Sequence, residues 1–168
     1  MSQEQAQYAP PQPTQEHTKL QELAGTWNVD CEFYMDPSQP PMKVQGKETV
    51  EAFGQFWIQS VFECEMFGAP FRGRSTLGYD PESKQYISTW IDTMSPMFFL
   101  LKGKYDASGK VLETRGRGYD CMMHRETDYR TRDETKSKDE HVFEMFMTLP
   151  DGNEVKMFTH RYRRAGKR

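Results

Sequence analysis

Residues 27–34 read Trp-Asn-Val-Asp-Cys-Glu-Phe-Tyr, a stretch in which apolar and polar side chains alternate at almost every step. The apolar members are Trp27, Val29, Cys31 and Phe33. Successive side chains of a β-strand point to opposite faces of its sheet, whereas a helix would repeat every three to four residues. The stretch therefore predicts a strand with one buried face.

The same period of two recurs along the chain and is interrupted by short turn-forming segments such as 80–83 and 150–153. Further strands are expected at residues 43–53, 55–67, 71–79, 85–92, 97–105, 111–116, 123–132, 141–148 and 154–164. Hairpin connections without intervening helices favour an up-and-down meander, and closing such a sheet removes its exposed edges. The prediction is an all-β fold, an antiparallel up-and-down barrel of about ten strands with a short N-terminal helix.

The two ends of the chain and one charged segment are expected to differ from the strands. Residues 1–13 are rich in Gln and Pro and have little to bury, so they are expected to form a disordered polar tail. Residues 14–168 are expected to form a single barrel domain, in which Thr14 caps the helix and Gly25 ends it. The charged run 133–140 is interpreted as a solvated loop.

Charge and cysteine content argue against several classes of partner. The formal net charge of −3 provides no broad cationic field, so neither nucleic acid nor a membrane is expected as a partner. The three cysteines are an odd number without CxxC spacing, which predicts free thiols in a reducing, cytoplasmic setting. The first residues lack the cationic and apolar regions of a secretory signal.

Several short motifs occur in an order that resembles the bacterial domain-of-unknown-function family one-five-seven-nine. They are Leu23-Ala24-Gly25-Thr26-Trp27, Gly68-Ala69-Pro70-Phe71-Arg72-Gly73, Leu77-Gly78-Tyr79-Asp80, residues 89–94, Phe143-Glu144-Met145 and Tyr162-Arg163-Arg164. The resemblance implies a calycin-like barrel, similar in shape to lipocalins, fatty-acid-binding proteins and the haem-binding nitrobindins. It implies no particular reaction, because fold analogy does not supply function.

Gly25-Thr26-Trp27 also resembles the entry strand of calycins, in which a tryptophan plugs one end of the barrel. The resemblance implies that Arg164, from the last expected strand, lies over the Trp27 ring. Such a contact is a structural cation–π interaction that needs no ligand.

The function expected from the sequence is non-catalytic binding of a small apolar or amphipathic molecule inside the barrel. The candidate ligand-binding residues are Trp27, Phe62, Tyr79, Trp90, Asp92, Phe158, His160 and Tyr162. A homo-oligomer is left open as a further partner.

Three alternatives remain open. The first is an enzyme that uses Asp92, Tyr79 or His160 for proton transfer, and the second is a structural barrel with a filled interior. The third follows from the resemblance to nitrobindins, in which a histidine from a late strand binds haem, here His160. No cofactor is the main expectation. No metal site is expected either, because strand alternation would separate Cys121 and Met123 from Met122 and His124.

Overall fold

The computed structural model describes residues 9–166. Residues 9–13 have no regular secondary structure and are exposed, and the remainder of the expected tail, residues 1–8, lies outside the described residues. The elements are α1 (Gln15–Gln21), β1 (Gly25–Phe33), β2 (Met42–Phe53), β3 (Trp57–Met66), β4 (Ala69–Asp80), β5 (Gln85–Asp92), β6 (Phe99–Tyr105), β7 (Val111–Asp120), β8 (Arg125–Ser137), β9 (Glu140–Thr148) and β10 (Glu154–Arg164).

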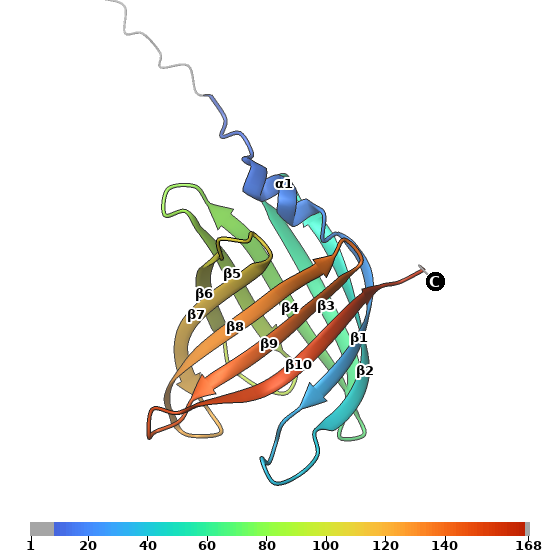
Figure 1. Cartoon of the computed structure of the whole chain (residues 1–168), viewed down its shortest axis with the longest axis vertical. Coiled ribbons are helices and arrows are strands. Elements are labelled where there is room, and N and C mark those ends of the chain that lie inside the picture. The colour runs from blue at the N-terminus through green and yellow to red at the C-terminus, as the bar shows by residue number, and fades with distance from the viewer. Residues whose placement is uncertain (1–8, 167–168) are drawn as a thin grey trace, which may run out of the picture.

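The ten strands form one closed antiparallel barrel in which each strand pairs with its neighbours in sequence (Figure 1). Closure is made by β1 and β10, whose register places Trp27 opposite Arg164 and Cys31 opposite His160. Every sheet edge is therefore paired, which satisfies the backbone donors and acceptors that an open sheet would expose. The expected all-β, up-and-down barrel with a short helix is confirmed.

The charged run expected to be a loop is instead strand. β8 continues to Ser137 and β9 begins at Glu140, leaving a tight turn between them. Asp133 and Thr135 share the inward face of β8, while Glu134 points outward and pairs with Arg132 and Lys136. The side chains of this segment alternate between the two faces of the strand. The interpretation as a loop was wrong, because it relied on the charge of the segment and overlooked this alternation.

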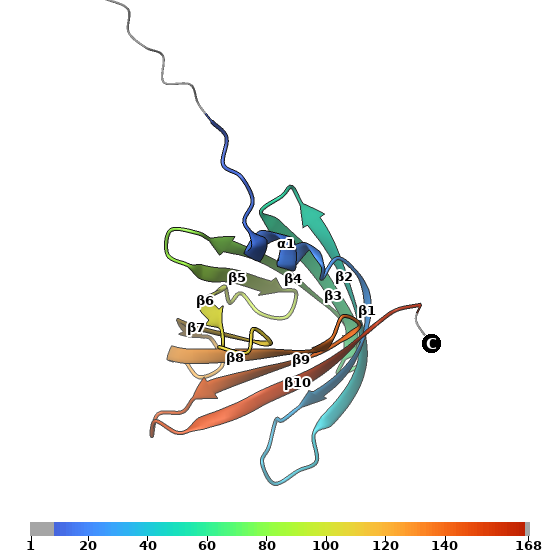
Figure 2. The ribbon, with the colours of Figure 1, turned by 45° about the horizontal axis from the view of Figure 1, so that its top comes forward.

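Helix α1 lies across one end of the barrel, next to β3 and β4 (Figures 1 and 2). His17 is buried and joins the helix to the barrel, because its Nδ1 accepts from the Thr14 N–H at 3.0 Å and its Nε2 donates to the Tyr79 carbonyl at 3.0 Å. Leu20 on the same face is 1% exposed. No helix within residues 9–166 is long and apolar enough to cross a membrane.

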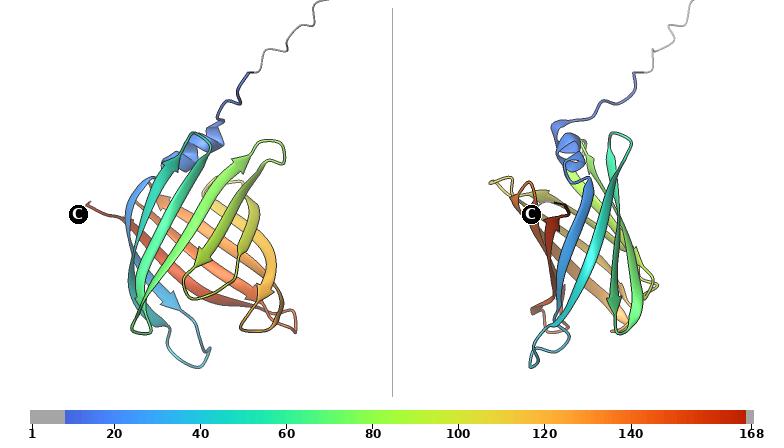
Figure 3. Two further views of the ribbon diagram at one scale, coloured as in Figure 1. Left: turned by 180° about the vertical axis from the view of Figure 1, so that it is seen from behind. Right: turned by 90° about the vertical axis from the view of Figure 1, so that its right-hand side faces the viewer.

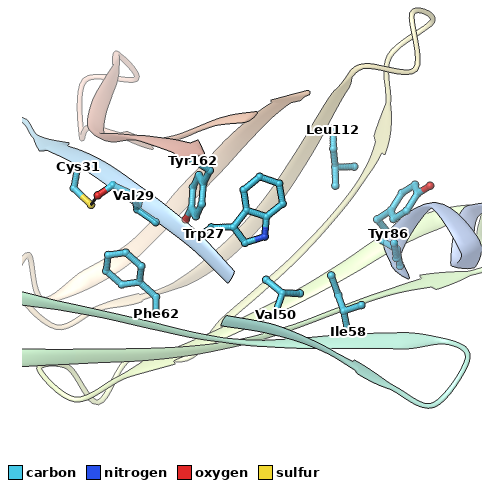
Figure 4. Close-up of a cluster of buried hydrophobic side chains, with 10 residues drawn as sticks. Trp27, Val29, Cys31, Val50, Ile58, Phe62, Tyr86, Leu112 and Tyr162 are labelled. Carbon is cyan, nitrogen blue, oxygen red and sulfur yellow. Dashed lines mark hydrogen bonds between the residues drawn. The ribbon is translucent and has the colours of Figure 1, made fainter. Parts of the chain in front are cut away.

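The buried side chains inside the barrel form two clusters that meet at the half-buried Phe143, which packs against both. The larger extends from the helix end along the barrel, and its members Tyr162, Trp27, Val50 and Ile58 point into the interior from the neighbouring strands β10, β1, β2 and β3 (Figure 4). The smaller centres on Tyr129, and the half-buried Phe143 and Phe158 pack against it. In the views of Figure 3 the long loop between β1 and β2 extends from the end opposite α1.

Candidate functional site

A cavity of about 570 Å³ lies at the helix end of the barrel, between α1 and the β8–β9 hairpin. Its lining residues are Lys19, Glu22, Leu23, Trp27, Tyr105, Thr135, Ser137, Lys138, Asp139, His141 and Arg164. This volume falls in the range of small-molecule sites. We call this space the mouth cavity.

Trp27 forms the inner wall of the mouth cavity and is only 2% exposed. Its indole N–H donates to the Leu23 carbonyl at 3.0 Å, and the Arg164 guanidinium lies 4.2 Å from the ring centroid. Arg164 also donates to the Ala24 carbonyl at 2.8 Å and pairs with Asp139 at 3.2 Å. The last strand, the first strand and the chain leaving the helix are therefore held together at this end of the barrel.

Lys19 borders the opposite side of the mouth cavity. Its Nζ lies 3.4 Å from the centroid of the Tyr105 ring and donates to the Gly109 carbonyl at 2.5 Å. Burial lowers the pKa of Lys19, although Glu22 and Asp106 act in the opposite direction. Lys19 thus connects α1 to the β6–β7 turn through a cation–π contact and a charged hydrogen bond.

Below the mouth cavity, polar side chains from six strands form what we call the inner polar cluster. Its members are Glu48, Ser60, Ser75, Asp133, His141 and Tyr162. Glu48 accepts hydrogen bonds from Ser60 and Tyr162, and the Ser60 and Ser75 hydroxyl oxygens are 2.7 Å apart. His141 Nδ1 lies 2.8 Å from Asp133 Oδ1, and its ring stacks on Tyr162 with centroids 4.2 Å apart.

The inner polar cluster favours bound protons. Burial raises the pKa of Glu48, an effect that the hydrogen bond from Ser60 and the charge of His141 only partly oppose. Burial acts to lower the pKa of His141, but the ion pair with Asp133 and the charge of Glu48 outweigh it, so that pKa is raised. Both shifts follow from carboxylates placed in a poorly solvated interior.

The expected site residue Tyr79 lies apart from this cluster. Its ring contacts Tyr86 with centroids 4.9 Å apart and meets His17 of the helix edge-on at 5.6 Å. Burial raises the pKa of Tyr86 to about 12, so its hydroxyl stays protonated at neutral pH. Tyr79 thus belongs to the contact between the helix and the barrel.

Trp90 and Asp92 lie together on the inward face of β5, away from the helix end. The Trp90 indole N–H donates to Asp92 Oδ2 at 3.1 Å, so this carboxylate already holds a partner. The indole lies directly on Gly73 of β4, where a Cβ would come within 2.1 Å of the ring. Gly73 is therefore required for the position of Trp90 inside the barrel.

His160 points inward among aromatic rings. The rings of Phe62 and Phe158 stack on it with centroids 5.3 and 4.5 Å away, and Phe33 meets it edge-on at 5.5 Å. Burial lowers the pKa of His160 to about 3, and its enclosed Nε2 has no hydrogen-bond partner. The surroundings of the imidazole are therefore aromatic rings, with no tyrosine or carboxylate bonded to Nε2.

This packing does not fit a haem bound through His160. An axial ligand needs free space at a ring nitrogen, yet Nε2 is enclosed by neighbouring atoms and His160 does not line the mouth cavity. Within residues 9–166, no group of three or more His, Cys, Asp or Glu side chains is placed to hold a metal ion.

The three groups proposed from sequence for proton transfer do not meet. Tyr79 and Asp92 lie at opposite ends of the β4–β5 pair, since Asp92 is in register with Gly73, six residues along β4 from Tyr79. At about 3.3 Å per residue, the separation along the strand is about 20 Å. His160 is on β10, on another part of the wall.

Sequence reasoning included Trp27 and Tyr162 but missed the three ionisable groups beside them, Glu48, Asp133 and His141. One signal was available for Glu48, which shares its strand phase with Val44 and Val50 and therefore faces the interior. Asp133 had no such signal once its segment was interpreted as a loop. The pairing of His141 with Asp133 depends on strand register.

The comparisons with known proteins identify the fold and the family. The structure resembles the S-type phycobiliprotein lyase CPES from Guillardia theta, with a TM-score of 0.62 and 8% identity over 90% of this chain and 93% of that one. It also resembles Rv2717c from M. tuberculosis, with a TM-score of 0.62 and 13% identity over 94% of this chain and all of that one. At such identities the likeness shows a shared barrel fold. The sequence matches no curated protein. The family model described as "Protein of unknown function (DUF1579)" matches residues 12–164, and the chain therefore belongs to that family.

Proposed function

We propose that this protein is a non-catalytic binder of one small apolar or amphipathic molecule, held at the helix end of the barrel. The observation that carries the proposal is the mouth cavity of about 570 Å³, which combines apolar walls with access to polar groups. Leu23, Trp27 and Tyr105 supply apolar surface, while His141 supplies a polar group deeper inside. An amphipathic molecule would gain from both.

The residual exposure of inward-facing side chains supports an interior that is not completely filled. Glu48, Trp90, Phe143 and Phe158 all point into a closed barrel, yet each keeps partial exposure. In a barrel whose side chains filled it to native density, inward residues at mid-strand would be buried throughout. This argues against the alternative of a purely structural barrel.

The cellular setting and assembly remain part of the proposal. All three cysteines are free thiols, with Cys31 buried and the other two partly buried. Free thiols are typical of reducing compartments, which supports a cytoplasmic location. The binding proposal requires only one barrel, and it is compatible with a homo-oligomer.

An enzyme is the second candidate, because the structure brings an oriented histidine next to a buried carboxylate. Asp133 holds one nitrogen of His141, as a carboxylate does in many acid–base sites, and Glu48 is a second carboxylate nearby, whose pKa burial raises. A ligand that returns chemically unchanged from the wild type supports binding. A ligand that is altered by the wild type and spared by His141→Asn supports the enzyme.

Titration with the uncharged fluorescent probe phenylnaphthylamine tests the binding proposal. We expect saturable binding of about one probe per barrel, because the mouth cavity is a single concave site. Thr135 lines that cavity, so Thr135→Phe should fill it and weaken probe binding at least about tenfold.

The matched control is Lys136→Phe, which adds the same ring at the next, exposed position of β8. It should bind the probe as the wild type does. Circular dichroism establishes that both variants are folded. Non-saturable binding to the wild type, or equal binding by folded Thr135→Phe, would refute the mouth cavity as the site.

A further inference from the structure

The inner polar cluster contains more acidic than basic groups. Glu48 faces the interior from β2 and Asp133 from β8, and His141 on β9 lies between them as the one imidazole. Fully ionised, these three side chains carry one net negative charge. That charge sits where solvent screening is weak, so it is available to a ligand that carries a positive charge.

The other inward-facing basic residues on the described strands do not neutralise this charge. Arg164 is held by the Ala24 carbonyl and Asp139 above Trp27. Arg125 lies at the opposite end of β8, where it donates to the Thr148 carbonyl. His160 is neutral at physiological pH because burial holds its pKa at about 3.

The proton affinities of the cluster are consistent with a shortage of positive charge. Burial raises the pKa of Glu48, and the charge of Asp133 adds to that shift while the charge of His141 opposes it. Burial acts to lower the pKa of His141, but Asp133 and Glu48 outweigh it and the pKa is raised. In the absence of a ligand cation, protons supply the missing charge. A bound cation would replace them.

Aromatic rings next to the cluster favour an organic cation over a hydrated metal ion. Tyr162 stacks on His141, and Trp27 meets the same imidazole edge-on with centroids 4.9 Å apart. Tyr105 lines the cavity above. Arg164 and Lys19 already lie over the Trp27 and Tyr105 rings, so what these rings offer a ligand is apolar surface, which suits a hydrocarbon chain and not a hydrated metal ion.

We propose that the ligand is an amphipathic amine, whose ammonium group pairs with Glu48 while its apolar part occupies the mouth cavity. This inference rests on the proposed binding function and specifies the class of ligand. The ammonium donates to the Glu48 carboxylate, and Asp133 keeps its partner His141. The hydrocarbon lies along Trp27 and Leu23.

Displacement of phenylnaphthylamine by three eight-carbon compounds tests the head group alone. Octylamine, octanoate and octanol have the same hydrocarbon chain, so differences between them report the cationic, anionic or neutral head. We expect octylamine to bind at least about tenfold more tightly than octanoate or octanol, as a charge-assisted hydrogen bond would provide. Native mass spectrometry with octylamine checks the stoichiometry independently of the probe.

Glu48→Gln keeps the size of the side chain and its hydrogen-bonding capacity but removes the charge. It should lower octylamine affinity by about tenfold and leave octanol affinity unchanged. Glu51→Gln is the matched control, because Glu51 is on the same strand but exposed to solvent. It should keep the wild-type order of affinities.

The outcomes separate this inference from the proposed function. If octanol and the probe bind but octanoate equals or exceeds octylamine in the wild type, the amine is refuted and the binding function stands. Retention of the amine preference in folded Glu48→Gln refutes Glu48 as its partner. If neither the probe nor any of the three compounds binds to the wild type, the binding function itself is refuted. The wild-type series is decisive even if Glu48→Gln does not fold.

Discussion

Replacement of Trp27 by alanine is expected to destabilise the barrel strongly, because this side chain connects several parts of the helix end. The indole is 2% exposed, donates to the Leu23 carbonyl at 3.0 Å, and lies 4.2 Å from the Arg164 guanidinium. Emptying a large aromatic site costs about 3–5 kcal/mol. The lost hydrogen bond, about 1 kcal/mol, places the expected value in the upper part of that range.

Urea unfolding monitored by circular dichroism measures this change as a shift in the midpoint urea concentration, with an unchanged dependence of the unfolding free energy on urea concentration. Trp27→Phe keeps a ring beneath Arg164 but loses the indole N–H, so it should retain more stability than Trp27→Ala. Phe53→Ala on β2 is the surface control, because Phe53 is 61% exposed, and it should change stability by less than about 0.5 kcal/mol. A loss below about 1 kcal/mol for Trp27→Ala would refute the conclusion that Trp27 holds this end together.

Three further predictions concern ionisable and reactive groups. Thiol titration in denaturant without reductant should find three free cysteines per chain, and a smaller number would indicate a disulfide. His141 has a raised pKa in the folded state, so its stabilising ion pair with Asp133 is complete below the ordinary pKa of 6.5 and is lost as pH rises through the folded value. In His141→Asn the unfolding free energy should therefore decrease less steeply above that pH. The charged groups that face the His141 ring are Glu48, Asp133 and Arg164. An unchanged pH dependence in the variant would contradict the raised pKa of His141. Haemin titration should give no saturable Soret shift at one equivalent, whereas a shift that His160→Ala abolishes would show that the packing around His160 opens for a ligand.

The local elements were predictable because their physical causes are local. Alternation along residues 27–33 and in later segments marks strands regardless of what they pair with. Turn-forming residues between the segments indicate hairpins, and Thr14 marks the start of the helix as its N-cap. The expected end at Gly25 was wrong, because the helix ends at Gln21 and Gly25 is the first residue of β1. The number of strands and their antiparallel order followed from these signals.

The candidate site was only partly predictable. Trp27 and Arg164 were placed together by resemblance to the calycin entry strand, and the structure shows the contact at 4.2 Å. Glu48 and His141 were missed because each is an unremarkable charged residue in sequence. Their importance comes from which residues face them across the barrel.

The sequence by itself assigned most strand residues to a face, because side chains alternate along a strand, but it missed Asp133 in the segment interpreted as a loop. Only the tertiary structure decided which inward side chains meet. Closure between β1 and β10 places Tyr162 and His141 beside Trp27, and register across β8 and β9 brings Asp133 within 2.8 Å of His141. Strand pairing joins residues far apart in the chain, and the register of each pair depends on all the others once the barrel closes. Local sequence patterns indicate the face of the strand on which a residue lies, whereas the charged groups of the inner polar cluster come together only in the closed barrel.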